Sequence, residues 1–221
     1  MAVIESPTTA ALAEVDTVHK AQRVSVRPLE ALGAYRLSAQ SGLLTGVAAA
    51  TATAGHLFAF RWTHATQLAV LTFMRLKMQT ITGFTAAQEV GFDVTIARSY
   101  SASHAGGTAL SAAGAGGFKK RASYPTSAVG DIRIGAAAAL TAGTHTLDAV
   151  PMAVDSYADL AAAATVPKGN ANLQIDFGQA QDHPIVLATN EGLVVRNLIL
   201  MGAGGTVRLT VEMGWYEVAA Y

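Results

Sequence analysis

Residues 192–221, GLVVRNLILMGAGGTVRLTVEMGWYEVAAY, decide the fold that we expect for this chain. An apolar, β-branched run occupies 193–201, and a glycine-rich segment follows it at 202–205. Glycine adopts a positive φ without strain, so this segment suits a tight turn. Apolar side chains then occupy every second position: Val207, Leu209, Val211, Met213 and Trp215. A period of two is typical of a strand with one buried face, so the stretch predicts a β-hairpin.

The first strand of this hairpin, at 193–201, is apolar on both faces, which favours a position inside a sandwich over one at a sheet edge. Upstream of it, short apolar or alternating segments recur between glycines and prolines. They lie at 57–62, 67–80, 90–100, 132–134, 144–152, 172–177 and 185–188. Eight or nine short strands with little helix predict an all-β fold, a jelly-roll-like β-sandwich with an extended N-terminal arm.

The same alternation assigns faces to the longer strands. In 67–80 the face of Met74, Leu76 and Met78 is predicted to line the core. In 90–100 the core-facing side chains are expected to be Val90, Phe92, Val94 and Ile96, with Asp93 and Thr95 pointing outward. A short helix is expected at 157–164, with Asp155 or Ser156 as its N-cap.

We divide the chain into an arm or linker, residues 1–55, and a β-sandwich domain, residues 56–221. The arm is rich in Ala and Thr, and Tyr35 is its single aromatic residue. It is interpreted either as a flexible tail or as a segment that folds against a neighbouring subunit. Residues 1–16 lack the features of a signal peptide, and the polar side chains of the uncharged stretch 37–60 argue against a membrane helix.

The composition restricts the classes of function. Half of the 221 residues are hydrophobic, but only 14% are charged, against about a quarter in typical soluble domains. We therefore expect part of the surface to be buried against other subunits. Lys and Arg together number 15, as do Asp and Glu, and this zero balance argues against a general nucleic-acid binder. The chain has no cysteine, which excludes disulfides and thiolate metal sites.

The histidines give no recognisable metal-binding motif. They are His19, His56, His64, His104, His145 and His183. None belongs to a His-Glu-x-x-His arrangement, and the pair His145 and Asp148 is weak evidence for a metal site. The sequence therefore predicts hydrogen-bonded or solvated loop histidines, and neither a metal ion nor a cofactor.

Motifs for catalysis are also missing from the sequence. The glycine-rich segments 114–117 and 202–205 match neither a P-loop nor a dinucleotide fingerprint. No Gly-x-Ser-x-Gly sequence occurs, and the carboxylates are isolated. We predict that the protein is not an enzyme.

One basic cluster stands out, in the Gly, Ala and Ser-rich loop 101–126. It consists of Lys119, Lys120 and Arg121, which could contact an acidic partner surface or a phosphate. The alternative interpretation is a solvated loop tip.

Several segments resemble uncharacterised structural proteins of tailed-phage virions. They are FTAAQE at 84–89, ARSY at 97–100, GGTAL at 106–110, DIRI at 131–134, LTAGT at 140–144, NEGLVVRN at 190–197 and WYEV at 215–218. The similarity covers roughly residues 56–221 and leaves out the arm. Because its motifs are structural, it transfers a class of protein and no active site.

The resemblance implies a component of a bacteriophage virion, assembled in the host cytoplasm. The most specific expectation is a capsid cement or decoration protein, which contacts the major capsid protein and copies of itself as a homo-oligomer. This step is an analogy from fold. The alternative is a receptor- or glycan-binding protein of the tail or head surface, which requires an exposed aromatic cluster. Neither interpretation involves a membrane or a specific nucleic acid.

Overall fold

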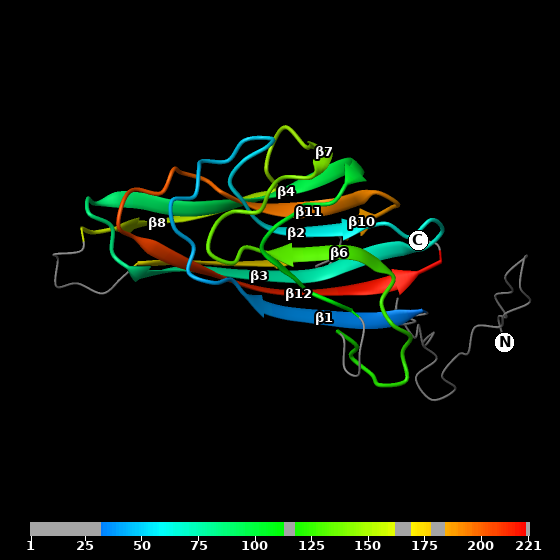
Figure 1. The fold of residues 1–221 in the computed structure, drawn as a ribbon. Helices are drawn as coiled ribbons and strands as arrows, with labels where there is room; N and C mark the ends of the chain where they lie inside the picture. The colour runs from blue at the N-terminus through cyan, green and yellow to red at the C-terminus, as the bar shows by residue number, and fades with distance from the viewer. Residues whose placement is uncertain (1–31, 113–117, 162–168, 178–183, 220–221) are drawn as a thin grey trace, which may run out of the picture.

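The computed structural model describes residues 32–112, 118–161, 169–177 and 184–219, which form twelve strands and no helix. Two antiparallel sheets pack face to face and enclose the main hydrophobic core (Figure 1). This arrangement confirms the predicted all-β sandwich, whereas the jelly-roll connectivity stays a prediction. Among the described residues, no helix exists that could cross a membrane.

One sheet has five strands. Its order begins with β1 (Gly33–Gln40), β12 (Thr206–Val218) and β3 (Leu68–Thr82). Two short strands, β9 (Asn170–Asp176) and β10 (Val186–Leu187), pair with successive parts of the far edge of β3. The long strands β12 and β3 therefore form the centre of this sheet.

The other sheet has seven strands. Its order begins with β5 (Thr108–Ala109), β6 (Val129–Ile134), β2 (His56–Trp62), β11 (Glu191–Asn197) and β4 (Gln88–Ala102). Both β7 (Thr144–Leu147) and β8 (Ala153–Asp159) pair with the outer edge of β4. The apolar strand β11 thus lies inside this sheet, between β2 and β4, as the sequence predicts.

The predicted hairpin is wrong, because β11 and β12 belong to different sheets. The chain leaves its sheet after Asn197, where the Asn197 side-chain amide donates to three backbone carbonyls: those of Val47, Ala48 and Ile199. The segment 198–205 then crosses to the opposite sheet. Gly204 has a φ of 78°, and a Cβ at Gly205 would collide with the Phe84 ring. The glycine-rich segment is therefore a tight connection, but between sheets.

The facing predicted for β12 is confirmed. Its five apolar side chains Val207, Leu209, Val211, Met213 and Trp215 are fully buried, while the alternate residues Thr206, Arg208, Thr210 and Glu212 are half-buried. The ring of Trp215 packs edge-on to Phe60 of the opposite sheet at 5.3 Å and stacks on Tyr35 of β1 at 5.5 Å. Met74, Leu76 and Met78 are buried as predicted.

The sandwich includes residues 33–47, which lie within the predicted arm. All eight residues of β1 pair with β12, from Gly33 opposite Glu217 to Gln40 opposite Thr210. Tyr35 and Leu37 are buried, whereas Arg36, Ser38 and Gln40 are exposed, so from Tyr35 onward β1 has the same period of two as the other strands. The weak apolar character of this stretch concealed that period. Residues 1–31 of the arm lie outside the described residues.

The helix predicted at 157–164 is also wrong where the structure describes it. Residues 153–159 form β8, which pairs with Gln88–Val94 of β4. Asp155 does not cap a helix, because its carboxylate accepts a hydrogen bond from the Asn172 amide of β9 at 2.8 Å. Residues 162–164 lie outside the described residues.

Changing Val211 to Asp should destabilise the fold by about 3–5 kcal/mol, because it places an unpaired charge in the apolar layer. Thr210→Asp is the matched control, since Thr210 is half-buried on the outer face opposite Lys77. Urea denaturation of both variants provides the measurement. Equal losses of stability would contradict the facing of β12.

Limited proteolysis should cut the exposed segment 51–53 without releasing the piece that precedes it. We expect the fragment that contains β1 to stay bound, because β1 is paired with β12 and Leu44 and Val47 are buried. Gel filtration of the cut protein, with and without denaturant, tests this. Separation of the fragment under native conditions would show that residues 33–47 are not part of the sandwich.

Candidate metal centre

The outer face of the seven-stranded sheet is covered, contrary to the sequence prediction for β4. Asp93 and Thr95, which were predicted to point outward, are only 3% and 0% exposed. The segment 48–55 crosses this face, and the Gly55 carbonyl accepts a hydrogen bond from the Asn197 amide at 2.7 Å. The period of two separates the two faces of β4 correctly, but it does not reveal that a second layer lies on the outer one.

A buried ion pair lies under this cover. The Arg196 guanidinium donates to both carboxylate oxygens of Asp93, at 2.8 and 2.7 Å, across the β11–β4 pairing. Its side chain is 13% exposed and that of Asp93 is 4% exposed. This bidentate pairing satisfies both charges in a region from which water is largely excluded.

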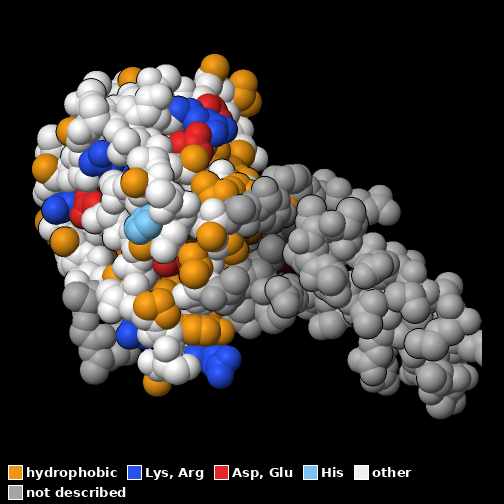
Figure 2. Space-filling view, turned by 90° about the vertical axis from the view of Figure 1, so that its right-hand side faces the viewer, with side chains coloured by type: hydrophobic (Ala, Val, Ile, Leu, Met, Phe, Trp, Pro, Cys, Tyr) orange, Lys and Arg blue, Asp and Glu red, His pale blue; other side chains and the backbone are white. Residues whose placement is uncertain are grey.

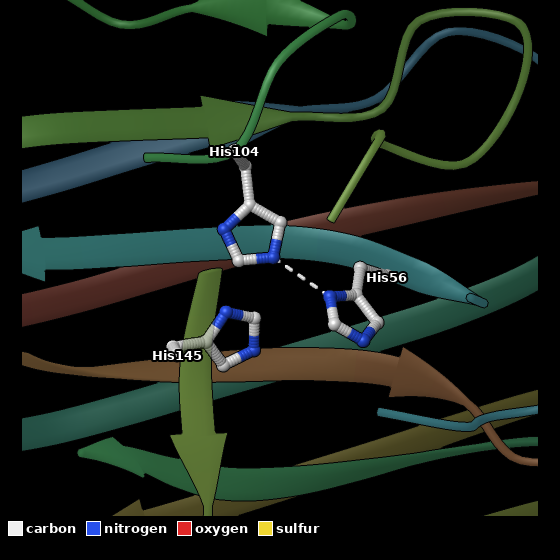
Figure 3. A group of neighbouring side chains, drawn as sticks. All are labelled: His56, His104 and His145. Atoms are coloured by element: carbon white, nitrogen blue, oxygen red, sulfur yellow. Dashed lines mark hydrogen bonds between the residues drawn. The ribbon is translucent and has the colours of Figure 1, made fainter. Parts of the chain in front are cut away.

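Three histidines meet beside this ion pair (Figure 3). His56 is the first residue of β2, His104 lies in the loop after β4, and His145 belongs to β7. One ring nitrogen of each lies within 4.8 Å of those of the other two. The rings point toward one another from three separate segments, and the shortest contact joins His56 Nδ1 to His104 Nε2 at 2.7 Å.

The backbone fixes the protonation pattern of this cluster. His56 Nε2 lies 3.1 Å from the Thr51 carbonyl oxygen. A carbonyl only accepts, so Nε2 carries the proton and donates it. In the neutral ring, Nδ1 of His56 then presents a lone pair to His104, whose Nε2–H is the donor in the 2.7 Å contact.

Burial keeps the cluster neutral. The pKa of His56 is lowered to about 4, chiefly by desolvation and against the opposing hydrogen bond to Thr51. The pKa of His104 is lowered to about 3 by desolvation first and by the neighbouring imidazoles second. The pKa of His145 is lowered as well, again chiefly by burial. Since all three values lie below the usual histidine pKa, the rings are uncharged at neutral pH.

Neutral imidazoles are ligands for transition metal ions, so the arrangement has the chemistry of a three-nitrogen metal site. The sequence predicted no metal site because its six histidines follow no motif. His56 and His104 are 48 positions apart, and only the pairing of β2, β4 and β7 across the sheet brings the three rings together.

The remaining histidines do not join this cluster. His64 accepts hydrogen bonds from the Thr66 and Gln67 amides through Nδ1, at 3.3 and 3.0 Å. Asp148, the suspected partner of His145, is instead paired with Arg98 at 3.2 Å. His19 and His183 lie outside the described residues.

The basic cluster Lys119, Lys120 and Arg121 is attached to the other sheet. The segment 118–120 hydrogen bonds to the free edge of β1, from the Arg36 amide to the Phe118 carbonyl at 2.6 Å and from the Lys120 amide to the Ala34 carbonyl at 2.9 Å. The Lys120 ammonium lies 4.9 Å from the centre of the Tyr216 ring. The cluster is therefore anchored along a sheet edge, and the structure does not bring it to the histidines.

Replacing Arg196 with Leu should destabilise the protein by about 3–5 kcal/mol, because it leaves the Asp93 carboxylate buried without its partner. The double variant Asp93→Leu and Arg196→Leu should recover most of that loss, since no buried charge remains. Chemical denaturation of the single and double variants measures the difference. A double variant as unstable as the sum of its single changes would show that the two residues act independently.

No protein-family model, curated protein or solved structure matched this chain. The resemblance to virion proteins therefore stays an expectation from sequence segments. Those segments lie on the frame of the sandwich: 131–134 belong to β6, 97–100 to β4 and 191–197 to β11. The functional argument that follows depends on this chain's own residues.

Proposed function

We propose that the protein is a structural component of a bacteriophage virion, of the capsid cement type. In this role it contacts the major capsid protein and copies of itself as a homo-oligomer. These contacts stabilise the boundaries between capsid subunits. One observation carries the proposal: of the six large apolar residues that are exposed in the described part of the chain, four belong to segments at one end of the sandwich, whereas Val150 and Val154 do not.

This apolar end consists of Leu43, Ile81, Leu160 and Leu200, whose side chains are 42%, 40%, 49% and 62% exposed. The segments that carry them all meet the start of β4 or of β12, and these two strands begin at the left in Figure 1. Leu44 bridges to Val207 near the start of β12, Thr82 pairs with Thr206, and Asp159 pairs with Gln88. The Gln88 side chain in turn accepts a hydrogen bond from the Gly202 amide.

Exposed apolar groups gathered in one region mark surfaces that bind other proteins. The ordered segments around them are held by backbone hydrogen bonds, such as Thr85 amide to Ala203 carbonyl at 3.0 Å and Met201 amide to Val47 carbonyl at 3.0 Å. The apolar end is thus a shaped, ordered surface, which loses little conformational freedom when a neighbouring subunit covers it.

The scarcity of charge sets the expected character of these contacts. The opposite end of the molecule shows Lys, Arg, Asp and Glu side chains as small separate groups among neutral and hydrophobic ones (Figure 2). Because only 14% of all residues are charged, we expect the interface at the apolar end to be mainly apolar and backbone-mediated, so moderate salt should not weaken it as it weakens an ionic clamp. Each further contact of an oligomer with the shell is intramolecular, which multiplies the affinity of a single site.

The receptor- or glycan-binding alternative gains no support from the aromatic residues. Sugar recognition of that kind requires an exposed aromatic surface. Within the described ranges, no Phe, Tyr or Trp side chain is exposed, and both Trp62 and Trp215 are fully buried. Phe118 and Tyr124, in the segment before β6, are half-buried.

Particles assembled without the protein should release their DNA at a lower temperature than complete particles, and added protein should restore the difference. The double variant Leu160→Glu and Leu200→Glu should fail to restore it, because charges at the apolar end oppose its burial. Replacing Lys119, Lys120 and Arg121 with Ala is the matched control and should restore nearly the full effect. Dye-monitored DNA release, at low and moderate salt, provides the measurement.

The isolated variants should keep the melting temperature of the parent chain, since both leucines are exposed. Equal release temperatures with and without the protein, together with lost adsorption to host cells, would sink the cement proposal and favour receptor binding. Restoration by the double Glu variant would instead locate the contact away from the apolar end.

A further inference from the structure

We propose that His56, His104 and His145 form a binding site for one Zn²⁺ ion. Three ring nitrogens from three separate segments converge within 4.8 Å, on a sheet face that the chain covers (Figure 3). His56 is completely buried and His104 is 3% exposed, so the donors are held in a packed environment. The inference stands independently of the proposed role in a virion.

The arrangement of His56 is that of a preformed ligand. Its Nε2–H donates to the Thr51 carbonyl at 3.1 Å, which fixes the ring orientation and leaves the Nδ1 lone pair directed at the other two rings. Histidines that bind metal ions commonly donate their second ring N–H to a carbonyl or carboxylate in this way.

His145 supplies a second, independent indication. Both of its ring nitrogens are shielded from solvent, and neither makes a hydrogen bond of good geometry, although the Gly143 backbone is near enough to favour the charged ring slightly. Buried polar atoms without partners are rare and costly, and a bound ligand is one of their common explanations. A metal ion held between the rings would engage one of these nitrogens.

Binding requires a small and chemically balanced rearrangement. Zn–N bonds of about 2.0–2.1 Å in tetrahedral geometry separate the ligand nitrogens by about 3.3 Å. His56 Nδ1 and His104 Nε2 would therefore move apart from 2.7 Å, while His145 would move closer. The proton on His104 Nε2 transfers to Nδ1 of the same ring, so the metal replaces a shared hydrogen bond and the three rings stay neutral.

The donor set selects the class of metal. Three imidazoles without a carboxylate suit Zn²⁺ and its neighbours among the first-row metals, whereas Ca²⁺ and Mg²⁺ require oxygen ligands. A water molecule completes the coordination.

The bound ion would cross-link the segments that cover the outer face of the seven-stranded sheet to the strands of that sheet. His56 begins the central strand β2, whereas His104 and His145 come from the loop after β4 and from the short edge strand β7. Among the described strands, β7 pairs only with β4, and the segment before β7 meets the loop after β4 and strand β2 through the isolated bridges Ala105 to Thr141 and His56 to Leu140. One ion would thus link β2 to the loop after β4 and to β7, two segments with which β2 forms no strand pairing.

The test uses the full chain without an affinity tag, stripped of metal with a chelator and dialysed. Calorimetric titration with Zn²⁺ should show one saturable site per chain. The melting temperature should rise by about 5–10 °C at a hundredfold excess of free Zn²⁺ over the dissociation constant. Co²⁺ should give the intense visible bands of a four-coordinate site, which Zn²⁺ then displaces.

His145→Ala should abolish both the saturable binding and the thermal shift. The ring of this residue packs on Tyr100 at 4.7 Å but makes no hydrogen bond of good geometry, so its loss removes packing and leaves no strong hydrogen bond broken. His64→Asn is the matched control and should bind as the parent chain does, because Asn preserves an acceptor for the amides of the loop.

Two outcomes would overturn the assignment: no saturable binding of Zn²⁺ or Co²⁺ to the parent chain, or binding that His145→Ala leaves unchanged. Should that variant fold poorly, nitrogen-15 spectra of the parent histidines decide the question. Zinc should move the proton of His104 from Nε2 to Nδ1, and unchanged tautomers would reject the site.

Discussion

The apolar layer between the two sheets is the interaction on which the rest of the structure depends. Trp215 contributes most to it, since its ring touches Tyr35 of its own sheet and Phe60 of the opposite one. The strands at the centre of the two sheets, β12 and β11, come from the same end of the chain but lie on opposite sides of this layer. Removing either would divide its sheet in two and expose part of the opposite sheet to water.

A second layer, polar in character, lies on the outer face of the seven-stranded sheet. Its buried groups satisfy one another: Arg196 pairs with Asp93, Asn197 donates to three carbonyls, and His56 engages Thr51 and His104. Buried polar groups of this kind fix geometry more strictly than apolar packing, because each has few acceptable partners. Hydrogen bonds therefore position the segments that lie over β4 and β11, whereas the packing of apolar side chains positions the residues of the inner core.

Local patterns foretold much of the fold and none of the histidine cluster. The period of two in β12 identified its buried face, because side-chain alternation depends on nothing beyond the strand itself. The partner of a strand is not local information, so the turn-like glycines suggested a hairpin where the chain crosses between sheets. Asp155 looked like a helix cap for a similar reason, since its actual partner, the Asn172 amide, belongs to another strand. The three histidines have no motif, and pairing across four strands creates their proximity.

The central position of the last two strands has a consequence for biosynthesis. The ribosome makes β1 to β4 first, yet these strands cannot complete their sheets until residues 191–218 exist. At about 5–20 residues per second, the wait between β1 and β11 is on the order of 10–30 s. During that time β2 and β4 expose edges that will later both pair with β11, and exposed apolar edges are sites of mispairing. A messenger cut short before the codons for residues 191–218 would thus yield a chain that holds most of the apolar residues and neither finished sheet, which is a substrate for aggregation and proteolysis.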